Sequence, residues 1–171
     1  MTNDIKESFC LSSDVKTALK LNKPVLAMES TLIAHGMPYP ENKEFALNAM
    51  NIARGLNVVP AIVAVLDGTV HVGIQEDQIV RLAMGKNIVK TSVQNISYVL
   101  STKQSGATTV SATARFAHLA GIHVLPTGGI GGVHRGVESS FDVSQDLIAL
   151  ANIPMIVISA GVKSILDIPK T

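Results

Sequence analysis

The sequence has no tryptophan, few aromatic residues and one cysteine, and each shortage excludes a class of protein. Aromatic residues make up 4% of the 171 residues, so the core must be built mainly from Val, Ile, Leu, Ala and Met. That composition favours buried parallel strands covered by helices over a β-sandwich. Cys10 alone excludes an intramolecular disulfide and indicates a reducing compartment. It lies outside the helices and strands that the sequence predicts.

Charge and long apolar runs are also scarce. A formal net charge of +1 provides no basic surface, so nucleic acid is not expected as a partner. The first eight residues are polar and do not resemble a signal peptide. The longest apolar stretches, such as residues 58–66, are too short to span a bilayer. With 47% hydrophobic residues, the chain is expected to be a cytoplasmic protein with one α/β domain over residues 1–171.

Helix and strand patterns alternate along the chain and predict an α/β fold. Predicted helices cover about 13–21, 40–56, 76–84, 94–100, 112–120 and 144–151. Predicted strands cover 24–28, 60–66, 69–72, 87–90, 107–110, 122–126 and 154–159. Asp67-Gly68 between two strands indicates a β-hairpin. The expected architecture is therefore a largely parallel sheet flanked by helices, with one hairpin. The second helix is expected to bury a stripe formed by Phe45, Ala49, Ile52, Ala53 and Leu56.

The fold is expected to be incomplete at its C-terminus. The strand 154–159 is apolar throughout, as in a strand covered on both faces, but little chain follows it. Pro169 ends the segment that begins at Ser164 within a few residues. One face or edge of the sheet should therefore lack its cover and form an apolar patch that includes Ile156, Ile158 and Ile165.

Glu29 ends a short apolar strand and precedes a segment, residues 35–40, that is predicted to be a loop. Open α/β proteins place their chemistry at the carboxyl ends of strands. A carboxyl group with apolar neighbours resists ionisation, so Glu29 can act as a general acid near neutral pH. A glutamate that caps the turn or pairs with a nearby base accounts for the pattern equally well.

Residues 127–132 form a glycine-rich segment after a predicted strand. No Gly-Lys-Ser/Thr follows, so it is not a P-loop, and it lacks the third glycine of a dinucleotide fingerprint. Four glycines in six residues indicate backbone N–H groups that bind an anion such as phosphate. A tight turn without a ligand is the alternative. The adjacent Arg135 could likewise hold an anion, or could pin the loop by bonding backbone carbonyls.

Two carboxylates and a hydroxyl lie close together in Asp142-Val-Ser144-Gln-Asp146. This set suits a hard divalent cation or a sugar hydroxyl. Acidic residues at a helix start also complement the helix dipole, which is the plainer explanation.

Two lysines are associated with strand ends. Lys163 follows the last predicted strand, and Lys90 ends another. A desolvated lysine beside a second cation becomes a nucleophile that can form a Schiff base with an aldehyde, whereas a snorkelling surface lysine is the alternative. We expect Glu29, Lys90, Asp142 and Lys163 to converge in one pocket that the glycine-rich segment borders.

Six segments, in this order, resemble the pseudouridine-5′-phosphate glycosidase family. They are residues 27–42 (AMESTLIAHGMPYPEN), 66–68 (LDG), 106–110 (GATTV), 127–136 (TGGIGGVHRG), 141–147 (FDVSQDL) and 160–167 (AGVKSILD). The resemblance extends from about Lys23 to Ile168. It implies an enzyme that reversibly cleaves the C–C glycosidic bond of pseudouridine 5′-phosphate, with water, to uracil and ribose 5-phosphate. It also implies a homo-oligomer such as a trimer.

The resemblance also implies site residues and a cofactor. Lys163 would attack C1′ covalently, and Glu29 would supply the proton for departure of uracil. The substrate would contact Lys90, the backbone near Val110, Ser144, Gln145 and Asp146. Asp142 would ligate Mn²⁺, or another divalent cation such as Mg²⁺.

Members of that family are nearly twice as long as this chain, which is therefore expected to be a C-terminally truncated member. Two other interpretations stay open. One is a catalytically silent fragment that keeps the site residues, and the other is a metal-dependent aldolase-like enzyme that uses Lys163 for a Schiff base.

Overall fold

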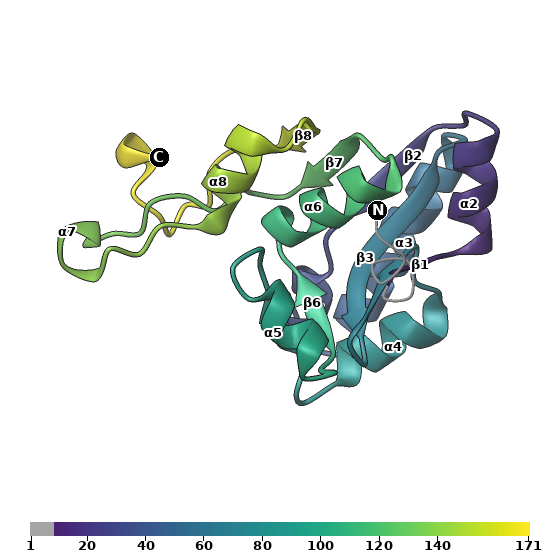
Figure 1. Cartoon of the computed structure of the whole chain (residues 1–171), viewed down its shortest axis with the longest axis horizontal. Coiled ribbons are helices and arrows are strands. Elements are labelled where there is room, and N and C mark those ends of the chain that lie inside the picture. Colours follow the sequence, from purple (N-terminus) through teal and green to yellow (C-terminus); the bar gives the residue numbers. More distant parts are fainter. Residues whose placement is uncertain (1–8) are drawn as a thin grey trace.

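The computed structural model describes residues 9–171, so the polar N-terminal segment used above to argue against a signal peptide lies outside it. In this range the strands form a six-stranded and a two-stranded sheet (Figure 1). The strands are β1 (Phe9–Leu11), β2 (Val25–Met28), β3 (Val59–Leu66), β4 (Thr69–Val72), β5 (Val89–Thr91), β6 (Gly106–Thr108), β7 (Val124–Thr127) and β8 (Ile156–Ser159).

Helices connect most of these strands, as the alternating pattern predicts. They are α2 (Ser13–Lys20), α3 (Glu41–Gly55), α4 (Glu76–Met84), α5 (Ile96–Ser101), α6 (Val110–Ala120), α7 (Val137–Ser140) and α8 (Gln145–Asn152). A π-helical turn, η1 (Leu32–Gly36), and a 3₁₀ turn, η2 (Ile168–Lys170), complete the set. The hydroxyls of Ser12 and Ser144 cap α2 and α8, respectively.

The long strand β3 organises the larger sheet, whose order is β1-β4-β3-β6-β5 with β2 also paired to β3. The pairs β1–β4, β2–β3, β5–β6 and β7–β8 are parallel, and the predicted hairpin joins β3 to β4. At its turn Asp67 and Gly68 both have positive φ, which a two-residue hairpin of this kind requires. The α/β class and the hairpin are confirmed. However, β6 runs antiparallel to β3, a pairing direction that hydrophobic periodicity does not encode.

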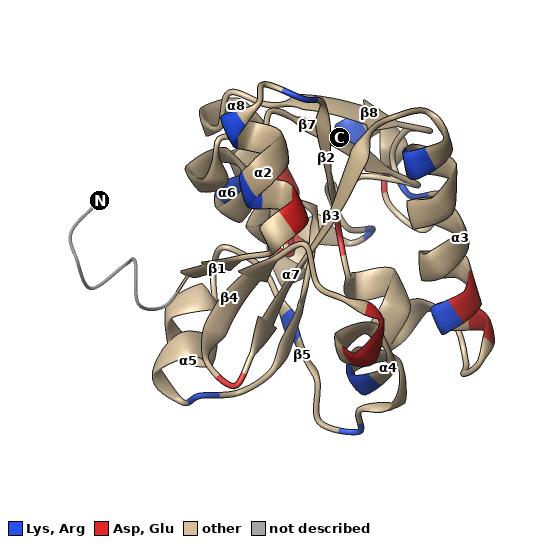
Figure 2. Cartoon of the chain, turned by 90° about the vertical axis from the view of Figure 1, so that its right-hand side faces the viewer, with Lys and Arg blue, Asp and Glu red and all other residues tan. Residues whose placement is uncertain are grey.

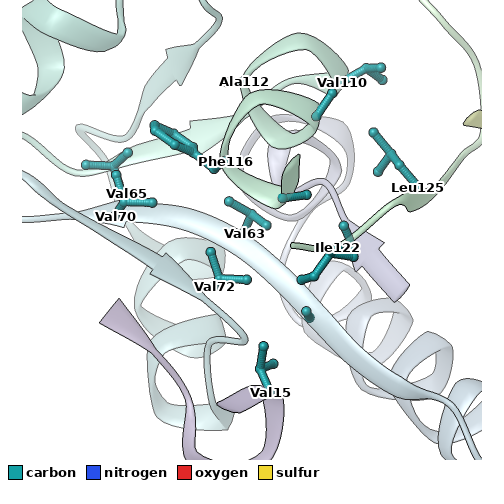
Figure 3. Packing of buried hydrophobic residues seen from close by; sticks show 14 of the residues in the cluster. Val15, Val63, Val65, Val70, Val72, Val110, Ala112, Phe116, Ile122 and Leu125 are labelled. Carbon is teal, nitrogen blue, oxygen red and sulfur yellow. The ribbon is translucent and has the colours of Figure 1, made fainter. Parts of the chain in front are cut away.

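Alternate side chains of β3 enter two hydrophobic clusters. Val63 and Val65 pack with α2 and α6 on one face, where Figure 3 shows them beside Val72 and Phe116. Ile62 packs on the other face with residues of α3 and α4. Successive side chains of β3 point to opposite faces of the sheet, and both faces are covered. This explains why the sequence of β3 is a continuous apolar run.

The predicted core stripe of α3 is wrong except at Ala53, which is buried. Phe45, Ile52 and Leu56 are exposed, and Asn42, Ala46 and Met50 form the buried face together with Ala53. Small side chains allow close packing on β3, and the Asn42 amide donates hydrogen bonds to carbonyls of η1 and α4. These tertiary contacts decide the orientation of the helix.

Two local predictions also need correction. Residues 35 and 36 belong to η1, so the predicted loop starts after this helical turn. Cys10 is exposed and lies in the edge strand β1, which was not predicted because the strand has only three residues.

The C-terminal elements β7, β8, α7 and α8 extend to one side of the larger sheet (Figure 1). Ile156, Ile158 and Ile165 are 62%, 59% and 72% exposed, as predicted. Figure 2 shows that Lys and Arg and Asp and Glu are both scattered over the elements in view. Among the helices of residues 9–171, none is long and apolar enough to cross a membrane.

Candidate active site

The carboxyl ends of β2 and β6 face each other beside Val63, in the middle of β3. β2 runs parallel to the first half of β3 and β6 antiparallel to the second half, so their carboxyl ends meet. Ser30 Oγ and Thr108 Oγ1 both donate to the Val63 carbonyl at 2.7 Å, and Ser30 N donates to the Thr108 carbonyl at 3.2 Å. These buried hydrogen bonds hold Glu29 next to the start of α6.

Glu29 lies between the ends of β2 and β7. Thr127 Oγ1 donates a hydrogen bond of 2.6 Å to Glu29 Oε1. Burial raises the pKa of Glu29, and the nearby charge of Asp146 adds to this, while Thr127 and the charges of Lys163 and Lys90 oppose it. Because the net pKa shift is upward, the side chain keeps a proton to higher pH than an ordinary glutamate, as a general acid requires.

Two cavities adjoin this strand end. A polar cavity of about 330 Å³ is lined by Lys90, Asp142 and Lys163, together with Ser144, Gln145 and Asp146. An apolar cavity of about 450 Å³ is lined by Glu29 and by residues of α3, β7 and β8. The expected convergence in one pocket therefore holds for the two lysines and Asp142, whereas Glu29 lines the neighbouring cavity. Val110 is fully buried and outside both linings, although Thr109 before it lines the polar one.

The glycine-rich segment borders both cavities: Thr127 and Gly128 line the apolar one and Gly131 the polar one. Two of its N–H groups, those of Ile130 and Gly131, already have partners in the protein. Ile130 N donates to the Gly161 carbonyl at 3.0 Å, and Gly131 N to Asp146 Oδ2 at 2.8 Å. These contacts argue against the predicted phosphate cradle, since the anion bound here is a carboxylate of the chain itself.

Close approach accounts for two of the glycines. A Cβ at position 129 would lie 3.1 Å from Lys163 Cγ, and one at position 131 would lie 2.1 Å from Ser144 Oγ. Glycine therefore lets the stem of Lys163 and the cap of α8 pack against this loop.

The two lysines are exposed and approach the polar cavity from different strands. Lys90 lies in β5, and burial, together with the charge of Lys90, lowers the pKa of His35. Lys163 follows β8, and its backbone N–H donates to the Ile130 carbonyl at 3.1 Å. Arg135 bonds the carbonyls of Ser164 and Leu166, each at 3.4 Å, so it pins the loop rather than holding an anion.

Asp142 offers one exposed carboxylate to the polar cavity, with His134 Nδ1 3.6 Å from its Oδ2. Within residues 9–171, no cluster of three or more His, Cys, Asp or Glu side chains could enclose a metal ion. A single carboxylate would suit a cation that keeps most of its waters.

Three polar residues at the site were not predicted from the sequence as site residues. Thr127 bonds Glu29, and Ser92 and Thr109 line the polar cavity. All three lie at or just after a strand end, so hydroxyl residues directly following apolar runs were the available signal.

Known proteins support the predicted resemblance. Residues 14–171 match the family model described as indigoidine synthase A like protein. A pseudouridine-5′-phosphate glycosidase from Roseobacter denitrificans is 52% identical over 160 residues, which are 94% of this chain and 52% of that protein. The one from Clostridium botulinum is 54% identical over 162 residues, or 94% and 53% of the two chains.

A solved structure matches as well. The crystal structure of a prealnumycin C-glycosynthase in complex with ribulose 5-phosphate superposes with a TM-score of 0.85 and 39% identity. The match covers 94% of this chain and 52% of the other. The chain thus spans about half the length of the curated relatives it matches. The resemblance inferred from the six segments is confirmed.

Proposed function

Because this chain belongs to the indigoidine synthase A like protein family, we propose that it carries the chemistry of a pseudouridine-5′-phosphate glycosidase. The reaction is the reversible cleavage, with water, of the C–C bond between uracil and the sugar, giving uracil and ribose 5-phosphate. The named activity of the relatives from Roseobacter denitrificans and Clostridium botulinum supports the substrate class.

The observation that carries the proposal is the position of Glu29 in the apolar cavity, near the two lysines of the polar one. It lines the apolar cavity, while Lys163 and Lys90, which line the polar one, are close enough to influence its pKa. A phosphorylated sugar suits the polar cavity with its two cations, and a flat base suits the apolar one. The bond to be broken would then lie beside the carboxyl group.

Two residues would divide the chemistry. The amine of Lys163 attacks C1′ of the ring-opened sugar and forms a covalent bond there, which splits a difficult displacement into two steps. Carbon is a poor leaving group, so the departing uracil ring must gain a proton, and Glu29 supplies it. Thr127 holds the Glu29 carboxyl group in place through its 2.6 Å hydrogen bond. Water then releases ribose 5-phosphate and restores the amine.

The other residues bind and orient. Lys90 pairs with the phosphate, while Ser144 and Gln145 hydrogen-bond to the sugar. Asp142 would hold Mn²⁺ or Mg²⁺, which would supply positive charge to the phosphorylated substrate. From the resemblance of the six segments, the functional enzyme is also proposed to be a homo-oligomer.

Uracil release tests the proposal. Purified protein is incubated with pseudouridine 5′-phosphate and Mn²⁺, and uracil is measured by chromatography for the wild type, Lys163→Arg and Glu29→Gln. Release by the wild type alone is expected, with a loss of about a hundredfold or more in Glu29→Gln.

Two results would reject the proposal. Folded wild-type protein that releases no uracil indicates a silent fragment. Lysine trapping by simple aldehydes, without uracil release, indicates aldolase-type Schiff-base chemistry instead.

A further inference from the structure

Asp146 is the one charged side chain that is buried in residues 9–171, with 3% of its surface exposed. Both carboxylate oxygens accept backbone hydrogen bonds. Oδ1 accepts the N–H of Ser111 at 2.9 Å, and Oδ2 accepts the N–H of Gly131 at 2.8 Å. The carboxylate therefore joins two segments of backbone that are distant in the sequence.

The first of these segments is the start of α6. Ser111 lies in its first turn, and its Oγ accepts the N–H of Val93 at 3.4 Å and bonds Thr109 Oγ1 at 2.9 Å. Val93 belongs to the loop that follows β5, the strand that carries Lys90. Through Ser111, Oδ1 of Asp146 is thus connected to the loop after β5, on the side of the cavity where Lys90 lies.

The second segment is the glycine-rich loop. Gly131 follows Ile130, whose N–H donates to Gly161 at 3.0 Å and whose carbonyl accepts the N–H of Lys163 at 3.1 Å. Oδ2 of Asp146 therefore fixes the stretch of backbone, at residues 130 and 131, to which the backbone N–H of Lys163 is hydrogen-bonded.

We infer that Asp146 is a positioning residue that sets the nucleophilic lysine relative to the opposite wall of the cavity, by holding the glycine-rich loop to the start of α6. The role of Lys163 as a nucleophile rests on the proposed function, whereas the contacts of Asp146 are independent of it. A carboxylate offers acceptors on both of its oxygens. An asparagine would face one backbone N–H with its own N–H₂ group and leave that donor unpaired.

The same charge acts on Glu29. Thr127, Lys163 and Lys90 all lower the pKa of Glu29, and Asp146 raises it. Removing the charge of Asp146 while keeping its shape should therefore lower the pKa of Glu29.

Hydrogen exchange of single amides in Asp146→Asn tests the clamp without any substrate. The amides of Ser111 and Gly131 should exchange about tenfold faster or more than in the wild type. The amides of β3 should change less. Asp77→Asn is the matched control, because Asp77 is also the second residue of a helix, α4, but is exposed. Unchanged exchange at both amides, or an equal increase throughout the protein, would overturn the inference.

Trapping of Lys163 tests the positioning. Its amine adds to the aldehyde of ring-opened ribose 5-phosphate and loses water, and cyanoborohydride reduces the resulting imine to a secondary amine. Trapping should be about tenfold slower in Asp146→Asn than in Asp77→Asn. An NMR titration of the Glu29 carboxyl carbon should shift to lower pH. Equal trapping rates with an unshifted titration would contradict the inference.

Gly131→Ala provides a second variant if Asp146→Asn does not fold. It keeps the carboxylate but would place a Cβ 2.9 Å from Asp146 Oδ2, so it should slow trapping similarly. Normal trapping in a folded Gly131→Ala protein would count against the clamp. A wild type that releases no uracil would reject the proposed function, while the exchange experiment would still decide the role of Asp146.

Discussion

At the scale of single residues, the environment of Glu29 accounts for the raised pKa of its side chain. The side chain accepts a hydrogen bond from a hydroxyl and lies mostly out of water, so its pKa is raised despite two lysines nearby. Apolar neighbours in the sequence predicted this desolvation. The partner Thr127 is 98 residues away along the chain, and local sequence gives no sign of that contact.

The raised pKa of Glu29 has a consequence for stability. Its native pKa lies above the unfolded value of about 4.3, so the stability it contributes is complete below that pH and is lost as pH rises through the native pKa. Glu29→Gln does not titrate and its Oε1 can still accept from Thr127. Its free energy of unfolding relative to the wild type should therefore increase over this pH window.

Urea unfolding at a series of pH values measures this difference. The exposed Glu44→Gln is the control and should show no comparable trend. A relative stability of Glu29→Gln that falls as pH rises would show that the carboxyl group is not desolvated as described.

At the scale of elements, the sequence predicted nearly every helix and strand but not how they pair. Apolar runs and glycine stops identified α4 and α6 closely. The antiparallel direction of β6 and the buried face of α3 depend on contacts with β3, which periodicity within one segment cannot report. The meeting of the β2 and β6 ends, on which the site depends, was therefore not predictable from local pattern.

The glycine-rich segment provides an element-scale prediction. Gly131→Ala should lower the free energy of unfolding by about 1–3 kcal/mol, because its Cβ would clash with Ser144 and Asp146. Gly128→Ala, in the same loop, meets no atom within 4 Å and should change it by less than about 0.5 kcal/mol. Chemical denaturation of both variants measures the contrast, and equal effects would refute the packing described for this loop.

At the scale of the whole molecule, apolar side chains are unevenly covered. β3 is buried along nearly its whole length, while the isoleucines of β8 are mostly exposed. Continuous apolar sequence was common to both strands, so the difference lies in the elements packed on them. The exposure of Ile156, Ile158 and Ile165 was predicted from the short chain that follows β8.

This unevenness predicts a contrast between two neighbouring strands. Leu125 in β7 is fully buried, so Leu125→Ala should cost about 2–5 kcal/mol of unfolding free energy. Ile156 in β8 is 62% exposed, so Ile156→Thr should cost less than about 1 kcal/mol. Urea denaturation at low protein concentration gives both values. A large loss in Ile156→Thr would mean that β8 is covered in solution.

The central claim is that Lys163 is the nucleophile of a site shared with Glu29 and Lys90. Peptide mapping by mass spectrometry, after incubation with pseudouridine 5′-phosphate and borohydride reduction, tests it most directly. The account predicts a sugar phosphate adduct on the peptide that contains Lys163, no adduct on Lys90, and none in Lys163→Arg. An adduct on Lys90 or on an unrelated surface lysine, or its persistence in Lys163→Arg, would contradict the account.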